Sequence, residues 1–236
     1  MTFVLQAAGK TDIGRVRKNN EDQFIIAELI KHLNIVQTSL SEPPIADHPP
    51  AGAIGHLLVV ADGMGGAAGG EVASGLAVET ITWYVTRTLP WFYRYQDGRE
   101  PELEAELVKV VEACQKAFTD AAGQFPRMGT TLTMAYVLWP RVYVVHVGDS
   151  RCYFRRDRQF VRVTKDHTVA QRAVDEGLIS AAEAESSPLN NQLWNYLGCR
   201  ASGVSPDIYH ATLQEGDELL LCSDGLTHGC LLPGSW

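Results

Sequence analysis

Short apolar or alternating segments, separated by polar and glycine-containing turns, predict most of the strands in this chain. The predicted strands cover residues 23–28, 57–61, 131–138, 142–147, 151–154, 160–163, 208–212 and 218–222. Between the first two strands, paired prolines at 43–44 and 49–50 predict an exposed loop over residues 38–56, since paired prolines disfavour both a helix and a central strand.

Two longer segments show helical spacing. Ala73, Ala77, Ile81 and Tyr84 recur at intervals of four and three, which predicts a helix over residues 70–88. Pro101 is suited to begin a second helix. Its apolar stripe would consist of Leu103, Leu107, Val110, Val111, Cys114 and Phe118. Shorter helices are predicted over residues 169–176 and 181–186.

The order of these elements indicates the fold class. Strands, then two helices, then more strands predict an α+β sandwich rather than a βαβ sheet. The chain has 236 residues and is 45% hydrophobic, which suffices for one sizeable core or two small domains. The residues before the proline-rich loop are too few for a core of their own, so we expect a single domain over residues 1–236.

The net charge and the cysteines argue against several classes of function. A formal net charge of −8 argues against a basic nucleic-acid-binding surface. Five cysteines at irregular spacing form no Cys-x-x-Cys zinc pattern. Their odd number and the lack of a signal peptide predict the reducing cytoplasm. No apolar run approaches the ~18 residues of a membrane span, so no membrane partner is expected.

Four short acidic clusters, far apart in the chain, each adjoin a predicted strand or its turn. They are Asn20-Glu21-Asp22, Asp62-Gly63-Met64-Gly65-Gly66, Gly148-Asp149-Ser150-Arg151 and Cys222-Ser223-Asp224-Gly225. Buried carboxylates repel one another and need a cation to stay ionised together. Carboxylate oxygens are hard ligands that suit Mg²⁺ and Mn²⁺. The clusters therefore predict a carboxylate cage around metal ions.

Asp62 is the central member of this set. It ends an apolar strand and precedes glycines, so it can face a cavity while the backbone turns sharply and leaves the Gly63 carbonyl free as a ligand. The alternative is a plain β-turn, for which Asp-Gly is a favoured pair. The presence of Glu21, Asp149 and Asp224 favours the metal site.

Arg17 lies four residues before Glu21. A guanidinium can bind phosphate oxygens through two parallel hydrogen bonds. Because Arg15 and Lys18 are close neighbours, a merely solvated charge is the alternative.

Six motifs in order carry a family resemblance. They are residues 14–22, Asp62-Gly63-Met64-Gly65-Gly66, Met128-Gly129-Thr130-Thr131, Gly148-Asp149-Ser150-Arg151, Thr164-Lys165-Asp166-His167-Thr168 and Leu221-Cys222-Ser223-Asp224-Gly225-Leu226. With them the chain resembles a type 2C (PPM) metal-dependent protein serine/threonine phosphatase of the bacterial kind. The resemblance covers residues 11 to 226.

This resemblance implies a four-layer α-β-β-α sandwich of two antiparallel sheets flanked by helices. It implies hydrolysis of phosphoserine and phosphothreonine in proteins by a metal-activated water, the substrates being those of a bacterial Ser/Thr kinase. At the family's positions, Arg17 would bind the phosphate and Asp22 would orient water at the metals.

The resemblance also implies two or three Mn²⁺ or Mg²⁺ ions. Asp62 would bridge two of them. Glu21 and the Gly63 carbonyl would hold one, and Asp224 the other. A third, weaker ion would lie on Asp149 and Asp224.

The proton donor to the leaving group is open. The family's usual general acid directly follows Asp-Gly, and this chain has Met64 there. His167 could protonate an alkoxide, but we expect it to be structural and to cap the flap segment over residues 165–190.

A cysteine-dependent mechanism is the rival phosphatase chemistry, because Cys152 and Arg158 fit a Cys-x₅-Arg pattern. That chemistry needs a glycine-rich cradle and a helix N-terminus around the phosphate. Cys152 instead begins an alternating β segment, so this mechanism is rejected.

The chain departs from the family pattern after Asp224. The family continues to a strand with an Asp-Asn pair whose Asp is a further metal ligand, and this chain has no Asp-Asn dipeptide. We therefore expect a fold that lacks its C-terminal strand or strands. The alternative function is an impaired phosphatase-like module that binds phosphoproteins or metal without efficient turnover.

Overall fold

The computed structural model describes residues 4–15, 17–29, 33–41, 55–65, 69–87, 100–199 and 203–229. Most of the predicted proline-rich loop, Gly66 and the segment after residue 229 lie outside the described residues.

The described strands form two antiparallel sheets. The larger sheet has the order β2-β1-β3-β5-β6-β9, with β4 paired to β3. Its strands are β1 (Asp22–Leu29), β2 (Leu33–Thr38), β3 (Gly55–Met64), β4 (Gly129–Thr130), β5 (Leu132–Leu138), β6 (Arg141–Val147) and β9 (Asp207–Thr212). The smaller sheet has the order β10-β7-β8. Its strands are β7 (Arg151–Arg156), β8 (Gln159–Arg162) and β10 (Glu218–Cys222).

Strand β5 shows why the middle of the larger sheet reads as a continuous apolar run. Met134 and Tyr136 pack toward the helices, whereas the alternate residues Ala135 and Val137 pack against the smaller sheet. Because side chains alternate between the two faces of a strand, a sheet covered on both faces needs apolar residues at every position.

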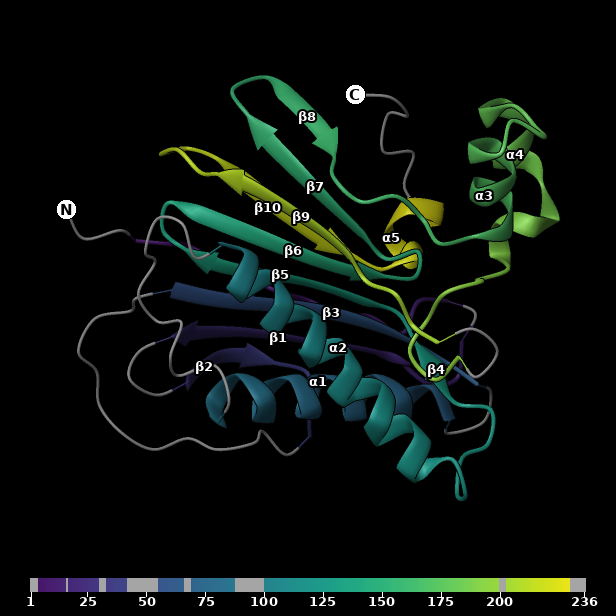
Figure 1. Ribbon diagram of the computed structural model, residues 1–236, viewed down its shortest axis with the longest axis horizontal. Coiled ribbons are helices and arrows are strands. Elements are labelled where there is room, and N and C mark those ends of the chain that lie inside the picture. Colours follow the sequence, from purple (N-terminus) through teal and green to yellow (C-terminus); the bar gives the residue numbers. More distant parts are fainter. Residues whose placement is uncertain are drawn as a thin grey trace.

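Helices α1 (Gly69–Arg87) and α2 (Glu100–Ala121) cover one face of the larger sheet, and the smaller sheet covers the other (Figure 1). The buried faces of α1 and α2 are those predicted from their spacing, including Ala77 and Ile81 on α1 and Leu107 and Cys114 on α2. The side chains buried between these two helices and the larger sheet form the main hydrophobic core.

Three short helical segments lie together at one end of the molecule (Figure 1). They are α3 (Val169–Asp175), α4 (Ala181–Ser186) and η2 (Pro188–Asn191). Ser180 and Glu183 form a capping box at α4, which satisfies the orphan N–H groups of its first turn. The predicted flap over residues 165–190 contains α3, α4 and most of η2. The name flap segment is used below for residues 165–193, which contain all three.

The predicted fold class is confirmed: the chain is an α+β sandwich of two antiparallel sheets with helices. Of the helix layer expected over the smaller sheet, the described residues show α5 (Asp224–Gly229), which adjoins β10. Strands β2 and β4 and helix α5 were not predicted. Within the described ranges, no helix combines the length and apolar character needed to cross a bilayer.

Candidate metal centre

A cavity of about 820 Å³ opens where the ends of β3 and β6, the start of α5 and the end of the flap segment meet. Six of the seven predicted site residues line it: Arg17, Glu21, Asp62, Gly63, Asp149 and Asp224. The fold therefore brings together carboxylates from distant parts of the chain. The seventh residue, Asp22, is not among the lining residues but is the cross-strand partner of Asp62.

Asp22 is held next to Asp62 by the pairing of β1 with β3, in which the two residues are direct cross-strand partners. Ser223 Oγ donates a hydrogen bond of 2.7 Å to Asp22 Oδ2. Burial, followed by the nearby charge of Asp224, raises the pKa of Asp22. The cross-strand pair thus places two carboxyl groups at one end of the sheet.

The backbone of Asp62 is fixed from two sides. Its N–H donates to Thr131 Oγ1 at 3.0 Å, and its carbonyl accepts from Thr130 Oγ1 at 2.9 Å and from the N–H of Thr131 at 2.9 Å. Because all three bonds engage the main chain, the side chain of Asp62 is left to face the cavity.

The aspartates raise one another's pKa. Burial is the main cause that raises the pKa of Asp62 to about 9, and the charges of Asp22, Asp224 and Asp149 add to it. Burial and the charge of Asp224 likewise raise the pKa of Asp149 to about 6. A cluster of this kind is electrostatically unfavourable unless a cation neutralises it.

Glu21 reaches the same cavity from the residue before β1. Its backbone carbonyl accepts hydrogen bonds from the N–H of Gly63 at 3.1 Å and from Ser74 Oγ at 2.6 Å. Its carboxylate lies so close to Gly70, at the beginning of α1, that a Cβ there would stand 2.5 Å from Oε1. The glycines of this region let helix, strand and carboxylate pack in direct contact.

We expect Gly63→Ala to destabilise this corner severely, because a Cβ at Gly63 would stand 1.9 Å from the carbonyl oxygen of Gly70. Overpacking against backbone typically costs ~1–3 kcal/mol or more. Thermal unfolding should show a lower Tm for Gly63→Ala and little change for Gly69→Ala, since a Cβ at Gly69 meets no atom within 4 Å. Equal Tm values for the two variants would show that the backbone can move apart where Gly63 meets the Gly70 carbonyl.

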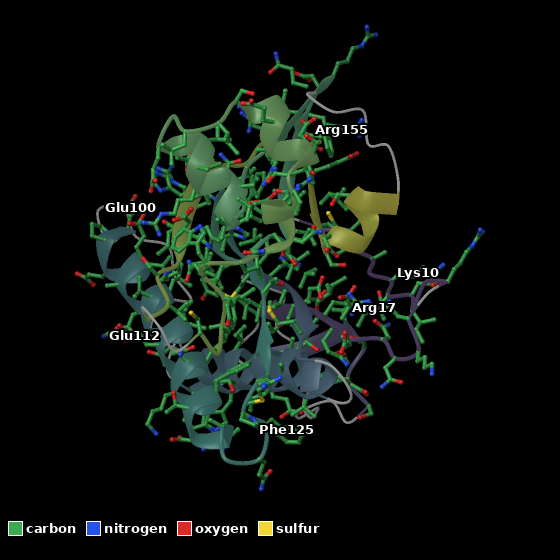
Figure 2. The ribbon with its side chains drawn as sticks, turned by 90° about the vertical axis from the view of Figure 1, so that its right-hand side faces the viewer. Lys10, Arg17, Glu100, Glu112, Phe125 and Arg155 are labelled. Carbon is green, nitrogen blue, oxygen red and sulfur yellow. The ribbon has the colours of Figure 1, made fainter. Side chains whose placement is uncertain are left out.

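Arg17 is the one cationic side chain in the described lining of the cavity. Its Nη1 lies 2.5 Å from Glu21 Oε2, and the side chain is 66% exposed. Figure 2 shows Arg17 on the same flank of the molecule as Lys10, opposite Glu100 and Glu112 of α2. The guanidinium is therefore accessible to a ligand that enters from solvent.

The donor set fits hard divalent cations. The four carboxylates that line the cavity, Glu21, Asp62, Asp149 and Asp224, offer oxygen ligands, which Mg²⁺ and Mn²⁺ prefer. In the part of the chain that is described, no three His, Cys, Asp or Glu side chains already stand as a complete ligand set.

Several lining residues carried no specific assignment from the sequence. Thr131 fixes Asp62, and the flap segment and the residues after it contribute Asn191, Gln192, Leu193 and Tyr196. Thr131 belongs to one of the six motifs, which was a usable signal. The flap residues could not be found, because nothing local in their sequence shows that they face the carboxylates.

His167 and Cys152 lie outside the cavity lining. The side chain that caps α3 is that of Thr168, not that of His167: Thr168 Oγ1 accepts from the N–H of Gln171 at 3.1 Å. Cys152 is buried in β7, and burial raises the pKa of its thiol to about 12. A thiolate nucleophile is therefore disfavoured at Cys152.

An α+β sandwich with a carboxylate-lined cavity at the ends of its strands defines a candidate metal-dependent hydrolase. The family model described as protein phosphatase 2C matches residues 50–232. The chain belongs to the protein phosphatase 2C family.

Known proteins resemble the chain over nearly its whole length. The serine/threonine protein phosphatase PstP of Mycobacterium tuberculosis is 35% identical over 232 residues, which cover 96% of this chain and 37% of that protein. The chain thus spans little more than a third of this relative's length. The S. agalactiae serine/threonine phosphatase structure has a TM-score of 0.72 at 28% identity, covering 94% and 80% of the two chains. The PstP catalytic domain with two manganese ions has a TM-score of 0.64 at 32% identity, covering 94% and 78%.

Proposed function

We propose that this chain hydrolyses phosphoserine and phosphothreonine in proteins, with Mn²⁺ or Mg²⁺ as cofactor. The observation that carries the proposal is the convergence of Glu21, Asp62, Asp149 and Asp224 around one open cavity that Arg17 also lines. Membership of the protein phosphatase 2C family and the manganese-bound relative support it.

The proposed ligands are Asp62, Glu21 and the Gly63 carbonyl for one ion, and Asp62 with Asp224 for another, while Asp149 and Asp224 would hold a third. When bound, the ions act as Lewis acids toward phosphoryl oxygens and lower the pKa of water at the site. Without this positive charge, the carboxylates would repel a phosphate dianion.

The remaining steps belong to the chain's own side chains. Arg17 would bind phosphoryl oxygens through its guanidinium and orient the phosphorus toward the carboxylate cluster. The amides of Asn191 and Gln192 line the same cavity and can hydrogen-bond the phosphate or the peptide. Asp22, held by Ser223, would orient the attacking water.

Neither a histidine nor the family's usual general acid is in place to protonate the leaving oxygen. The described lining of the cavity contains neither histidine nor lysine, and Met64 stands at the family's general-acid position. We therefore expect a water molecule to supply this proton.

Arg17→Ala should raise KM for a phosphopeptide by about tenfold or more and change kcat much less, because it removes the guanidinium that would bind phosphate and leaves every proposed metal ligand in the chain. Steady-state kinetics at saturating Mn²⁺ separate the two parameters. Lys18→Ala removes a neighbouring exposed charge and should leave KM nearly unchanged. A loss confined to kcat would contradict the proposed role of Arg17.

The direct test of the function is release of phosphate from phosphoserine and phosphothreonine peptides with added Mn²⁺ or Mg²⁺. We expect turnover that requires the metal. Binding of the peptide without turnover would support the impaired module instead, and absence of both would refute the proposal.

The proposed setting is the cytoplasm, where the enzyme would reverse signals from a bacterial Ser/Thr kinase. The described cysteines Cys114, Cys152, Cys199 and Cys222 are all buried and free, which is typical of a reducing compartment.

A further inference from the structure

A buried histidine connects the candidate metal centre to the flap segment. The side chain of His167 is 4% exposed. Its Nδ1 lies 3.1 Å from the backbone nitrogen of Gly148 and 2.9 Å from Asn195 Nδ2. Its Nε2 lies 3.2 Å from Asp207 Oδ2. The imidazole is therefore engaged at both ring nitrogens, by groups from three separate parts of the chain.

These partners fix the tautomer of the ring. The amide of Asn195 is oriented by Ser205, since Nδ2 donates to the Ser205 carbonyl at 2.7 Å and Oδ1 accepts from the Ser205 N–H at 3.3 Å. Both neighbours of His167 Nδ1 are thus N–H donors, so Nδ1 must accept and carries no proton. The proton is on Nε2 and is donated to Asp207, which also accepts from Tyr209 at 2.9 Å.

On one side, His167 grips the peptide group that precedes Asp149. The ring accepts from the N–H of Gly148, and the backbone N–H of His167 donates to the Gly148 carbonyl at 2.7 Å. Gly148 has φ +109°, and a Cβ there would stand 2.7 Å from Thr131. The turn that presents Asp149 to the cavity is therefore held at both polar atoms of one residue.

On the other side, His167 holds Trp194 and Asn195, the two residues that follow the flap segment. Its carbonyl accepts from the N–H of Trp194 at 3.0 Å, and the two rings lie 5.1 Å apart. Trp194 and Asn195 sit between Gln192 and Tyr196, which both line the cavity. One buried side chain thus sets the position of a candidate metal ligand and of a wall of the cavity.

We propose that His167, oriented by Asp207, is a positioning residue that couples the Asp149 turn to the flap segment. It acts through Gly148 and Asn195 and does not touch the substrate, because the ring lies outside the cavity lining and its N–H is committed to Asp207. Loss of the Nδ1 acceptor would loosen Asp149 and the cavity wall together. This inference rests on the proposed function for its kinetic consequence, but not for its structural one.

The test compares His167→Asn with His167→Leu in the full chain. Asn places an oxygen acceptor near the position of Nδ1, whereas Leu offers none. We expect His167→Leu to speed hydrogen exchange at the Gly148 amide by about tenfold. We expect it also to weaken Mn²⁺ binding by about tenfold, because groups that orient metal ligands typically contribute 10–100-fold to metal affinity. His167→Asn should stay within about threefold of the parent chain in both. Calorimetry measures the affinity without any substrate.

His210→Leu is the matched control. His210 is 61% exposed on β9 and pairs with Glu104 of α2, not with the partners of His167. A merely structural role for His167 predicts a lower Tm with unchanged Mn²⁺ affinity, and that result overturns the proposal. Equal effects of His167→Asn and His167→Leu also overturn it.

Two further measurements keep the test decisive. If His167→Leu does not fold, nitrogen-15 spectra of the parent chain still test the proposal. They show which ring nitrogen of His167 carries the proton, and a proton on Nδ1 instead of Nε2 would contradict the proposed role. In kinetics, His167→Leu should raise KM for a phosphopeptide and His167→Asn should not. If the parent chain hydrolyses no phosphopeptide, the proposed function fails while the exchange and calorimetry data still test His167.

Discussion

Asp62→Asn is expected to lower kcat for phosphopeptide hydrolysis by about 10²–10³-fold or more. The asparagine keeps the shape of the side chain but removes the negative charge from the proposed bridging position between two ions. Loss of a single preorganised electrostatic group from an active site commonly costs this much. Single-turnover kinetics at saturating Mn²⁺ measure the effect on chemistry separately from substrate binding.

The same substitution should not unfold the protein. The backbone bonds of Asp62 to Thr130 and Thr131 do not involve its carboxylate. In the metal-free protein, Asp62→Asn should even raise Tm, because it relieves repulsion among buried carboxyl groups. Asp120→Asn, which changes an exposed carboxylate on α2, is the control and should leave both activity and Tm unchanged. Parent-level turnover in Asp62→Asn would exclude the proposed two-metal site.

Metal removal should have an effect at least as large as that of Asp62→Asn. Treatment with a chelator should abolish turnover, and Mn²⁺ should restore it, since the carboxylate cluster repels phosphate until cations neutralise it. Mn²⁺ at 100 times its Kd should stabilise the folded chain by about 2.7 kcal/mol through mass action. Thermal unfolding at increasing Mn²⁺ concentration measures this shift directly.

Asp62→Asn provides the comparison for the thermal shift as well. Because this variant lacks the central ligand, Mn²⁺ should raise its Tm much less than that of the parent chain. An equal shift in both proteins would place the bound ions away from Asp62. Turnover that persists in excess chelator would contradict metal dependence altogether.

Periodicity and length predicted most of the fold. Helix α1 was recognised because Ala77 and Ile81 repeat at helical spacing over a long segment, and tertiary packing buries that same face. Strand β5 was recognised as a continuous apolar run, although the run alone does not say that Met134 and Ala135 face different layers. Strand β2 was missed because its six residues carry no strong apolar alternation.

The site was predicted where the chemistry is local in sequence and missed where it depends on folding. Asp62 and Asp224 stand beside strand ends within recognisable motifs, so both were found. Tyr196 and Asn191 line the same cavity only because the chain after α4 returns to the strand ends. The orientation of His167 depends on Asp207, which lies 40 residues further along the chain. A contact between residues so far apart in sequence cannot be predicted from a local pattern.

Divalent cations are expected to bind among these carboxylates. Anomalous scattering from crystals soaked in Mn²⁺ tests it most directly, because manganese positions are then seen without assumptions about the ligands. We predict manganese peaks inside the cavity, with one ion touching Asp62 together with Glu21 or the Gly63 carbonyl, and a further ion at Asp224. An empty cavity at saturating Mn²⁺, or peaks confined to other surfaces of the molecule, would contradict the account.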